Sequence, residues 1–200
     1  MLGYYAVSEE LLVPVYREGP DMDHAVTLDE WKDLVAEEHH ETLLVSACLG
    51  TVNSRYDGTH RYEPRIEELS QHYNLVFVCP EVLGGLPTPR TPAETSPGYS
   101  ATDVLDGNAS VVTKDGTNVT DEYLGGADRS LDIANAVGGR KALMMERSPS
   151  CGVHTIYDGT YSGTLKEGRG VSTALLDRDG IDVYAVDEID ILLELVEDSA

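Results

Sequence analysis

Short apolar runs recur at intervals along most of the chain. Leu43–Ala47, Leu75–Val78 and Ala142–Met145 are largely apolar runs of four or five residues, bounded by polar or turn-forming residues. Runs of this length and type are typical of strands that are buried on both faces of a parallel sheet. A further strand is predicted at Ile181–Ala185.

Segments with apolar residues on one helical face lie between these runs. The spacing predicts helices over residues 64–72, 120–137, 171–178 and 187–197. Thr120 is expected to cap the longest of them, and the pair Gly138-Gly139 ends it. Because strands and helices alternate, we predict an α/β fold: a three-layer α/β/α domain built on a mostly parallel sheet.

Two kinds of connection interrupt the alternation. Residues 109–119 read as a short β-hairpin insertion, because Asp115-Gly116 is a strong turn signal between two β-type segments. Residues 80–98 and 152–170 form long loops, and the first is rich in proline and glycine. Loops of that length inside a compact domain are often functional.

The first 41 residues have a different pattern. They contain a β-like run, Leu11–Tyr16, and a predicted helix from Leu28 to about His39 with Thr27 as its N-cap. We therefore predict an N-terminal appendage over residues 1–41 and an α/β domain over residues 42–200.

Charge excludes several classes of partner. The 200 residues include 14 Lys and Arg against 36 Asp and Glu, a net charge of −22. Nucleic-acid binding needs a basic face, and an anionic membrane surface would repel this chain. No apolar run is long enough to span a bilayer, and Glu9 and Glu10 are wrong for a secretory signal, so a cytoplasmic location is expected. The acidic surface also predicts a halophilic protein whose stability rises with salt.

Each of the three cysteines follows a predicted strand. Cys48 and Cys79 come directly after the first two strands, and Cys151 lies six residues beyond Met145. The carboxyl ends of parallel strands form one edge of a sheet, so the three thiols are expected to meet there. Disulfides are not expected in the cytosol, and the odd number agrees.

Three converging thiolates would be soft metal ligands. Structural zinc usually takes a fourth protein ligand and a Cys-x-x-Cys pair, which this chain lacks. A four-iron cluster held by three cysteines would leave one iron open, and an open position is typical of catalytic metals. The alternative is that the three cysteines are small buried apolar side chains.

Five segments together resemble the thiouracil desulfidase family, formerly known only as a domain of unknown function. They are Val45–Leu49, Arg55–Gly58, Val78–Arg90, Arg147–Gly152 and Tyr157–Gly163. The resemblance extends from about Thr42 to Ala185. It implies an iron–sulfur enzyme that removes sulfur from a thiolated nucleobase, or a similar small thiocarbonyl compound, by non-redox cleavage of the C–S bond.

The resemblance also implies particular roles for residues of this chain. Cys48, Cys79 and Cys151 would hold a 4Fe-4S cluster, and Glu81 and Ser148 would be catalytic. A carboxylate at Glu81 is a sensible general base, and the Ser148 hydroxyl could position the substrate or a water molecule. Without the resemblance, Glu81 reads as a surface carboxylate and Ser148 as a turn residue.

Weaker candidates surround these positions. Substrate contacts are assigned to Arg55, Tyr56, Asp57, Arg90 and Ser150, although the arginines could instead bridge carboxylates of the fold. The expected partner is a small thio-compound, and the sequence predicts no particular oligomeric state. The competing hypothesis for the whole protein is a non-enzymatic iron–sulfur module that binds a partner or senses sulfur or oxidation.

Overall fold

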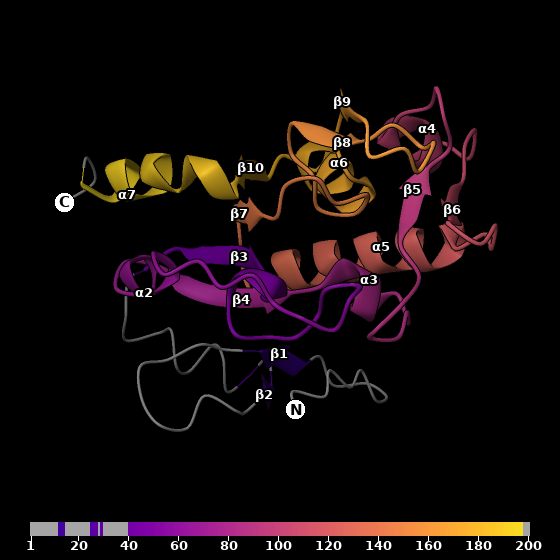
Figure 1. The fold of residues 1–200 in the computed structure, drawn as a ribbon. Coiled ribbons are helices and arrows are strands. Elements are labelled where there is room, and N and C mark those ends of the chain that lie inside the picture. The colour runs from indigo at the N-terminus through magenta and orange to yellow at the C-terminus, as the bar shows by residue number, and fades with distance from the viewer. Residues whose placement is uncertain (1–11, 15–24, 28, 30–39, 198–200) are drawn as a thin grey trace.

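A fully parallel four-stranded sheet forms the centre of the molecule (Figure 1). The computed structural model describes residues 12–14, 25–27, 29 and 40–197. The strand order is β10-β7-β3-β4, with bounds β3 Thr42–Ser46, β4 Asn74–Val78, β7 Lys141–Met144 and β10 Asp182–Ala185. The four predicted strands are therefore present, each within about one residue of its expected ends.

Side chains from the sheet make up most of the main core. All five residues of β3 are buried, as are the last four of β4 and the last three of β7, which is why these segments read as apolar runs rather than alternating ones. The register places Leu44 beside Val76 on one side and beside Ala142 on the other.

Helices cover both faces of this sheet. α5 (Thr120–Ala136) packs against α6 (Val171–Arg178), and both contribute residues to the main core. α2 (Ile66–Leu69) is tied to α7 (Ile189–Glu197) by the ion pair between Arg65 and Asp190, and these helices also contribute to that core. The predicted three-layer α/β/α class is confirmed.

The structure changes some helix boundaries. The helix expected over 64–72 is regular only at Ile66–Leu69, and the one expected from Asp187 begins as a 3-10 turn, η2 (Val186–Glu188). Thr120 was expected to cap α5 but is its first residue, because its hydroxyl donates to Asn118 Oδ1 at 2.6 Å instead. Val119 is the N-cap.

The two long loops contain regular structure that their composition hides. Residues 80–98 include α3 (Pro80–Leu83) and β5 (Ala93–Thr95), and residues 152–170 include the hairpin of β8 (Thr155–Tyr157) and β9 (Leu165–Glu167). The hairpin insertion is present: β6 (Val111–Thr113) turns back on Asn118, and its other edge pairs with β5.

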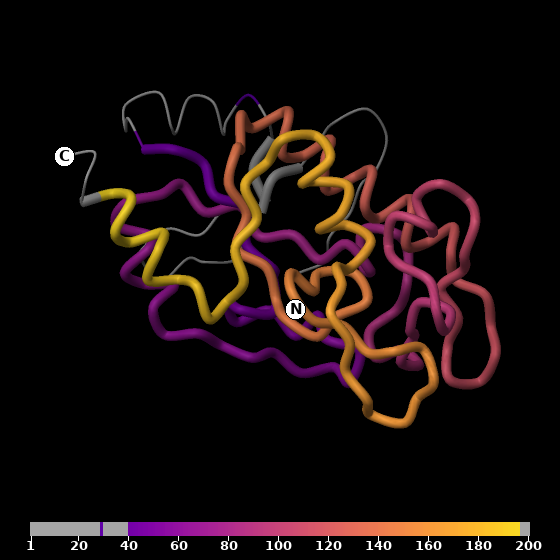
Figure 2. The backbone as a smooth tube through the Cα atoms, turned by 90° about the horizontal axis from the view of Figure 1, so that it is seen from above, coloured from indigo at the N-terminus to yellow at the C-terminus, as the bar shows by residue number. Residues whose placement is uncertain are grey.

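These insertions gather at one end of the molecule. β5, β6 and α4 (Ala101–Leu105) lie at the opposite end from α7, as the view from above also shows (Figure 2). They enclose a second, smaller core with the first half of α5 and the start of α6. The first of the two long loops thus contributes to a packed subdomain beside the sheet.

Only short parts of residues 1–41 belong to the described chain. β1 (Leu12–Pro14) pairs with β2 (Ala25–Thr27), which agrees with a β-like run near Leu11–Tyr16. The helix expected from Leu28 to His39 lies outside the described residues apart from Asp29. The division into an appendage and a domain from residue 42 stays a prediction. Within the described ranges, no helix has the length and apolar character needed to cross a membrane.

Candidate active site

The strand order of the sheet reverses between β3 and β7. The chain goes from β3 to β4 on one side, and later enters β7 on the other side of β3. Ligands of open parallel sheets bind outside the carboxyl ends of the strands at such a reversal. Cys48 lies there in the 3-10 turn η1 (Ala47–Leu49), Cys79 directly follows β4, and Cys151 lies in the loop after β7.

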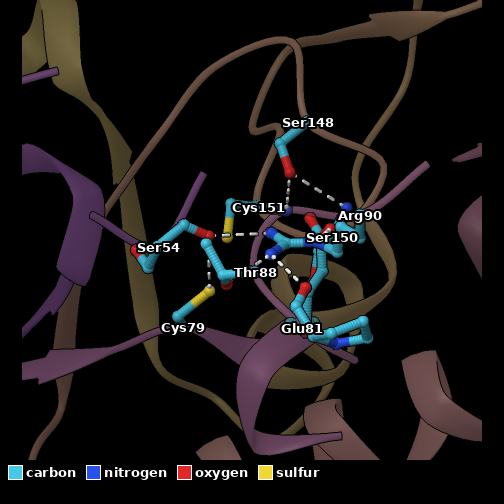
Figure 3. A network of polar contacts seen from close by, with 10 residues as sticks. Ser54, Cys79, Glu81, Thr88, Arg90, Ser148, Ser150 and Cys151 are labelled. Carbon is cyan, nitrogen blue, oxygen red and sulfur yellow. Dashed lines mark hydrogen bonds and ion pairs between the residues drawn. The ribbon is translucent and has the colours of Figure 1, made fainter. Parts of the chain in front are cut away.

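The three cysteines line one cavity of about 380 Å³ at this edge. The predicted residues Glu81, Ser148, Arg55, Tyr56 and Arg90 line the same cavity. Its volume falls within the range of small-molecule sites, about 300–1,000 Å³. Figure 3 shows the sulfur atoms of Cys79 and Cys151 together on one side of the Arg90 guanidinium. The fold therefore brings together three cysteines of which the first and last, Cys48 and Cys151, are more than 100 residues apart in sequence.

The thiols influence one another electrostatically. Burial raises the pKa of Cys48 to about 12, and the charge of a Cys79 thiolate adds to that shift. Burial also raises the pKa of Cys79, and it raises the pKa of Cys151 well above its ordinary value, with further contributions from Cys79 and Cys48. Three thiolates in this cavity would therefore repel each other unless a cationic group lay between them, and metal binding would release their protons.

The three thiols form a soft donor set for a metal group. Within the part of the chain that the structure describes, no three His, Cys, Asp or Glu side chains are close enough to ligate one metal ion. The three thiols nevertheless share a cavity. An iron–sulfur cluster, whose ligands attach to separate iron atoms, fits a set of three thiol ligands in one cavity.

Glu81 is held in one orientation beside the cysteines. Arg90 Nε donates to Glu81 Oε2 at 2.6 Å, and the Arg90 and Glu81 side chains are only 6% and 13% exposed. Tyr123 lies buried beside Glu81: burial raises the pKa of the Tyr123 phenol well above its ordinary value, and the Glu81 charge adds to that shift. Arg90 is fixed in turn, because its Nη2 donates to the Ser54 carbonyl oxygen at 2.9 Å (Figure 3). Arg90 thus binds a carboxylate of the protein, which is one of the two roles predicted for the arginines; the other was substrate contact.

Close backbone packing places Glu81 at this point. Cys79 is the N-cap of α3, so Glu81 follows in its first turn. α3 lies directly on α5, where Gly84 and Gly126 permit the contact: a Cβ added at Gly126 would lie 1.9 Å from the Pro80 carbonyl oxygen. The same contact brings Tyr123, also on α5, to the Glu81 carboxylate.

Ser148 forms the turn that presents Cys151. Its Oγ accepts hydrogen bonds from the backbone N–H groups of Ser150 at 3.2 Å and Cys151 at 3.0 Å. The turn role anticipated from Pro149 is therefore real, and the hydroxyl proton stays available for donation. Ser150 does not reach the cavity: it is fully buried, and its Oγ lies 3.2 Å from Ser172 Oγ.

Arg55 and Tyr56 meet at the wall of the cavity, and Asp57 pairs with Arg55 from outside that wall, with 3.7 Å between Arg55 Nε and Asp57 Oδ1. The Arg55 guanidinium carbon lies 5.8 Å from the centre of the Tyr56 ring, within cation–π range. Asp57 is absent from the cavity wall, and its Oδ1 also accepts a hydrogen bond from Thr59 Oγ1 at 2.6 Å.

Further cavity residues had no clear sequence signal. They include a second carboxylate, Glu94, and the phenol of Tyr123, whereas Tyr161, which also lines the cavity, lies in the family-like segment Tyr157–Gly163. Glu94 lies on β5, inside the stretch that composition marks as a loop, so no pattern placed it near the cysteines. Its position depends on the pairing of β5 with β6. An acidic residue in the middle of a proline-rich loop was the only available hint.

Comparisons with known proteins agree with this geometry. The family model described as 2-thiouracil desulfurase matches residues 43–188. A solved structure of a [4Fe-4S]-dependent thiouracil desulfidase, TudS, superposes with a TM-score of 0.67 at 40% identity, covering 78% of this chain and 99% of that chain. The uncharacterized protein YbbK of Bacillus subtilis (strain 168) is 42% identical over 151 residues, which are 76% of this chain and 99% of YbbK.

Proposed function

This chain belongs to the 2-thiouracil desulfurase family, and from that premise we propose that it is an iron–sulfur-dependent desulfidase. The proposed substrate is a thiolated nucleobase such as thiouracil, or a similar small thiocarbonyl compound. The convergence of three buried cysteines, Glu81 and Ser148 on one cavity is the observation that carries this proposal.

The donor set fits a 4Fe-4S cluster held by Cys48, Cys79 and Cys151. When bound, such a cluster supplies an iron without a protein ligand, a Lewis acid with affinity for a soft thiocarbonyl sulfur. Arg55 lowers the pKa of Cys48, and Arg90 lowers that of Cys79, each against a larger rise from burial. These two cations therefore assist deprotonation of the ligands.

Glu81 is the proposed general base. Conversion of the thiocarbonyl to a carbonyl consumes one water molecule and releases hydrogen sulfide, so two protons move from oxygen to sulfur and no electrons are transferred. Glu81 would take a proton from the attacking water and return it to the departing sulfur. Arg90 would hold the carboxylate in place during both transfers. The free proton of Ser148 would orient the substrate or the water.

Of the weaker substrate candidates, Arg55 and Tyr56 are the ones we retain. Both line the cavity, and neither is fixed by a buried ion pair as Arg90 is. The 44% exposed Tyr56 ring offers a flat apolar face near the opening. Asp57 and Ser150 would act on a ligand only through the loops that they stabilise.

The first experiment tests the metal. Anaerobic purification and reconstitution should give a brown protein with about four irons per chain. Replacing Cys48, Cys79 or Cys151 singly with serine should lower the iron content and the visible absorption. Colourless protein that contains only zinc would refute the proposed cofactor.

The second experiment tests the reaction. Loss of the thiocarbonyl absorption of 2- or 4-thiouracil should follow addition of the iron-loaded protein. Glu81→Gln should lower turnover by about 100-fold or more while the iron content is retained. Glu68→Gln, an exposed carboxylate on α2, is the matched control and should leave turnover unchanged. Iron-loaded wild-type protein that converts neither compound would favour the alternative, a non-enzymatic binding or sensing module.

A further inference from the structure

Glu94 is a buried carboxylate in the same cavity as the cysteines and Glu81, and the proposed reaction does not use it. It is 8% exposed and lies on β5, where it forms part of the cavity wall. Among the residues that the structure describes, no Lys or Arg forms an ion pair with it. Burying a carboxylate is costly unless hydrogen bonds or ligands compensate for the lost water.

Only one of its two oxygens is occupied by the protein. Glu94 Oε2 accepts hydrogen bonds from the backbone N–H groups of Gly159 at 2.8 Å and Tyr161 at 3.2 Å. In the described part of the chain, no group donates a hydrogen bond to Oε1. Oε1 is not fully buried either, because the buried polar atoms that lack a partner do not include it. Oε1 is therefore an open acceptor on the cavity side.

The carboxylate is held rigidly. The Tyr161 hydroxyl accepts a hydrogen bond from the Glu94 backbone N–H at 3.1 Å and donates one to the Val112 carbonyl. The loop that contains Tyr161 is therefore bonded to both β5 and β6. Gly159 has a φ of +94°, and a Cβ there would lie 2.3 Å from the Thr95 carbonyl oxygen. The loop can approach β5 this closely only with glycine at that position.

A fixed, open carboxylate oxygen selects a ligand that donates a hydrogen. Glu81 is less suited to this purpose, because Arg90 already donates to its Oε2 and its other oxygen is assigned to the proton transfers of the proposed reaction. A cyclic thioamide has a ring N–H next to its C=S group, as does its oxo product next to C=O. Pairing that N–H with Glu94 would orient the ring within the cavity.

We propose that Glu94 Oε1 accepts the ring N–H of the ligand and makes the cavity selective for nucleobases that are not alkylated on that nitrogen. The proposal rests on the proposed function. It assigns Glu94 to specificity rather than to bond cleavage, so the expected loss is in ligand affinity and in KM. A carboxylate with only a structural role in the loop would not distinguish N–H from N-methyl ligands.

The test uses unreactive product analogues, so that it does not depend on turnover. Calorimetry would measure binding of 1-methyluracil, which keeps one ring N–H, and 1,3-dimethyluracil, which has none, to the iron-loaded protein. Wild type should prefer 1-methyluracil by about 10- to 100-fold, the worth of a hydrogen bond to a charged group. Glu94→Gln should reduce that preference at least tenfold, since its amide can face the ligand as a donor while its oxygen accepts the loop N–H groups.

Glu167→Gln, an exposed carboxylate on β9, is the control and should keep the wild-type preference. Equal binding of both ligands by wild type would overturn the proposal, whether or not the Glu94 variant folds. Loss of affinity for both ligands by the same factor in Glu94→Gln would also overturn it. Intact discrimination in a protein that converts no thiouracil would instead refute the proposed reaction alone.

Discussion

The two adjacent glycines of α5, Gly125 and Gly126, should respond in opposite ways to the same substitution. A Cβ at Gly125 would meet nothing within 4 Å. A Cβ at Gly126 would lie 1.9 Å from the Pro80 carbonyl oxygen and 2.8 Å from its carbon, both backbone atoms of α3. Alanine therefore fits at the first position and forces α3 away from α5 at the second.

The expected magnitudes follow from these contacts. Alanine favours a helix interior over glycine by about 1 kcal/mol, so Gly125→Ala should raise Tm by about 2–4 °C in a chain of this size. The backbone overlap at Gly126 is at the upper end of overpacking costs, about 3 kcal/mol. After the helix gain is subtracted, Gly126→Ala should lose about 2 kcal/mol and lower Tm by about 4–8 °C.

The same displacement should reach the active site. To relieve the overlap, α3 must move by about 1 Å, and α3 carries Glu81 beside the cysteines. A misplacement of that size can lower turnover by about 100-fold. Thermal unfolding followed by circular dichroism, together with thiouracil turnover, would measure both effects. Equal Tm values for the two variants, or full activity in Gly126→Ala, would contradict the assigned contact between α3 and α5.

Three other predictions follow from charges on the structure. Arg90→Met should cost about 3–5 kcal/mol by leaving the Glu81 carboxylate buried without its partner, and Glu81→Gln in the same chain should recover part of the loss in urea unfolding. Burial would raise the pKa of Glu188, but hydrogen bonds from the Ala185 N–H and His154 lower it overall. Its contribution is therefore present above the pKa of the unfolded chain and is lost as pH falls through the lower folded value, so Glu188→Gln should flatten the acid limb of the stability curve. Finally, the net charge of −22 predicts a Tm that rises from low to molar salt, and an unchanged Tm would count against a halophilic protein.

Much of the fold was predictable because three strands of the central sheet, β3, β4 and β7, are buried along most of their length. The run at Leu75–Val78 has no polar residue that would suggest a surface helix. Asp115-Gly116 is a pair that commonly forms the turn of a β-hairpin. Helix ends were less predictable: the Thr120 hydroxyl could cap α5 or bond to Asn118, and only the packing of the hairpin selects the second. β5 was missed because the partner strand that makes it a strand lies elsewhere in the chain.

The three cysteines and Glu81 were predictable as candidates for one site because each lies directly after a recognisable strand or in a motif that resembles the family. Arg90 was recognised only as one cation near the site, and its part as the partner of Glu81 became visible through the 2.6 Å contact. Glu94 and Tyr123 were not identified at all. They reach the cavity from a strand and a helix whose own sequences contain no sign of the chemistry beside them.

The order of residues along the chain thus determined the strands, the parallel sheet and the edge at which the thiols gather, because burial period and chain direction are local properties. Tertiary structure alone decided which polar groups are already satisfied and which are left to act on a ligand. Arg90 donates to Oε2 of Glu81, while two backbone N–H groups donate to Oε2 of Glu94 and leave its Oε1 without a hydrogen bond from the described residues. Those assignments depend on contacts between segments far apart in sequence, and a hydrogen bond is decided by the distance between atoms rather than by residue type.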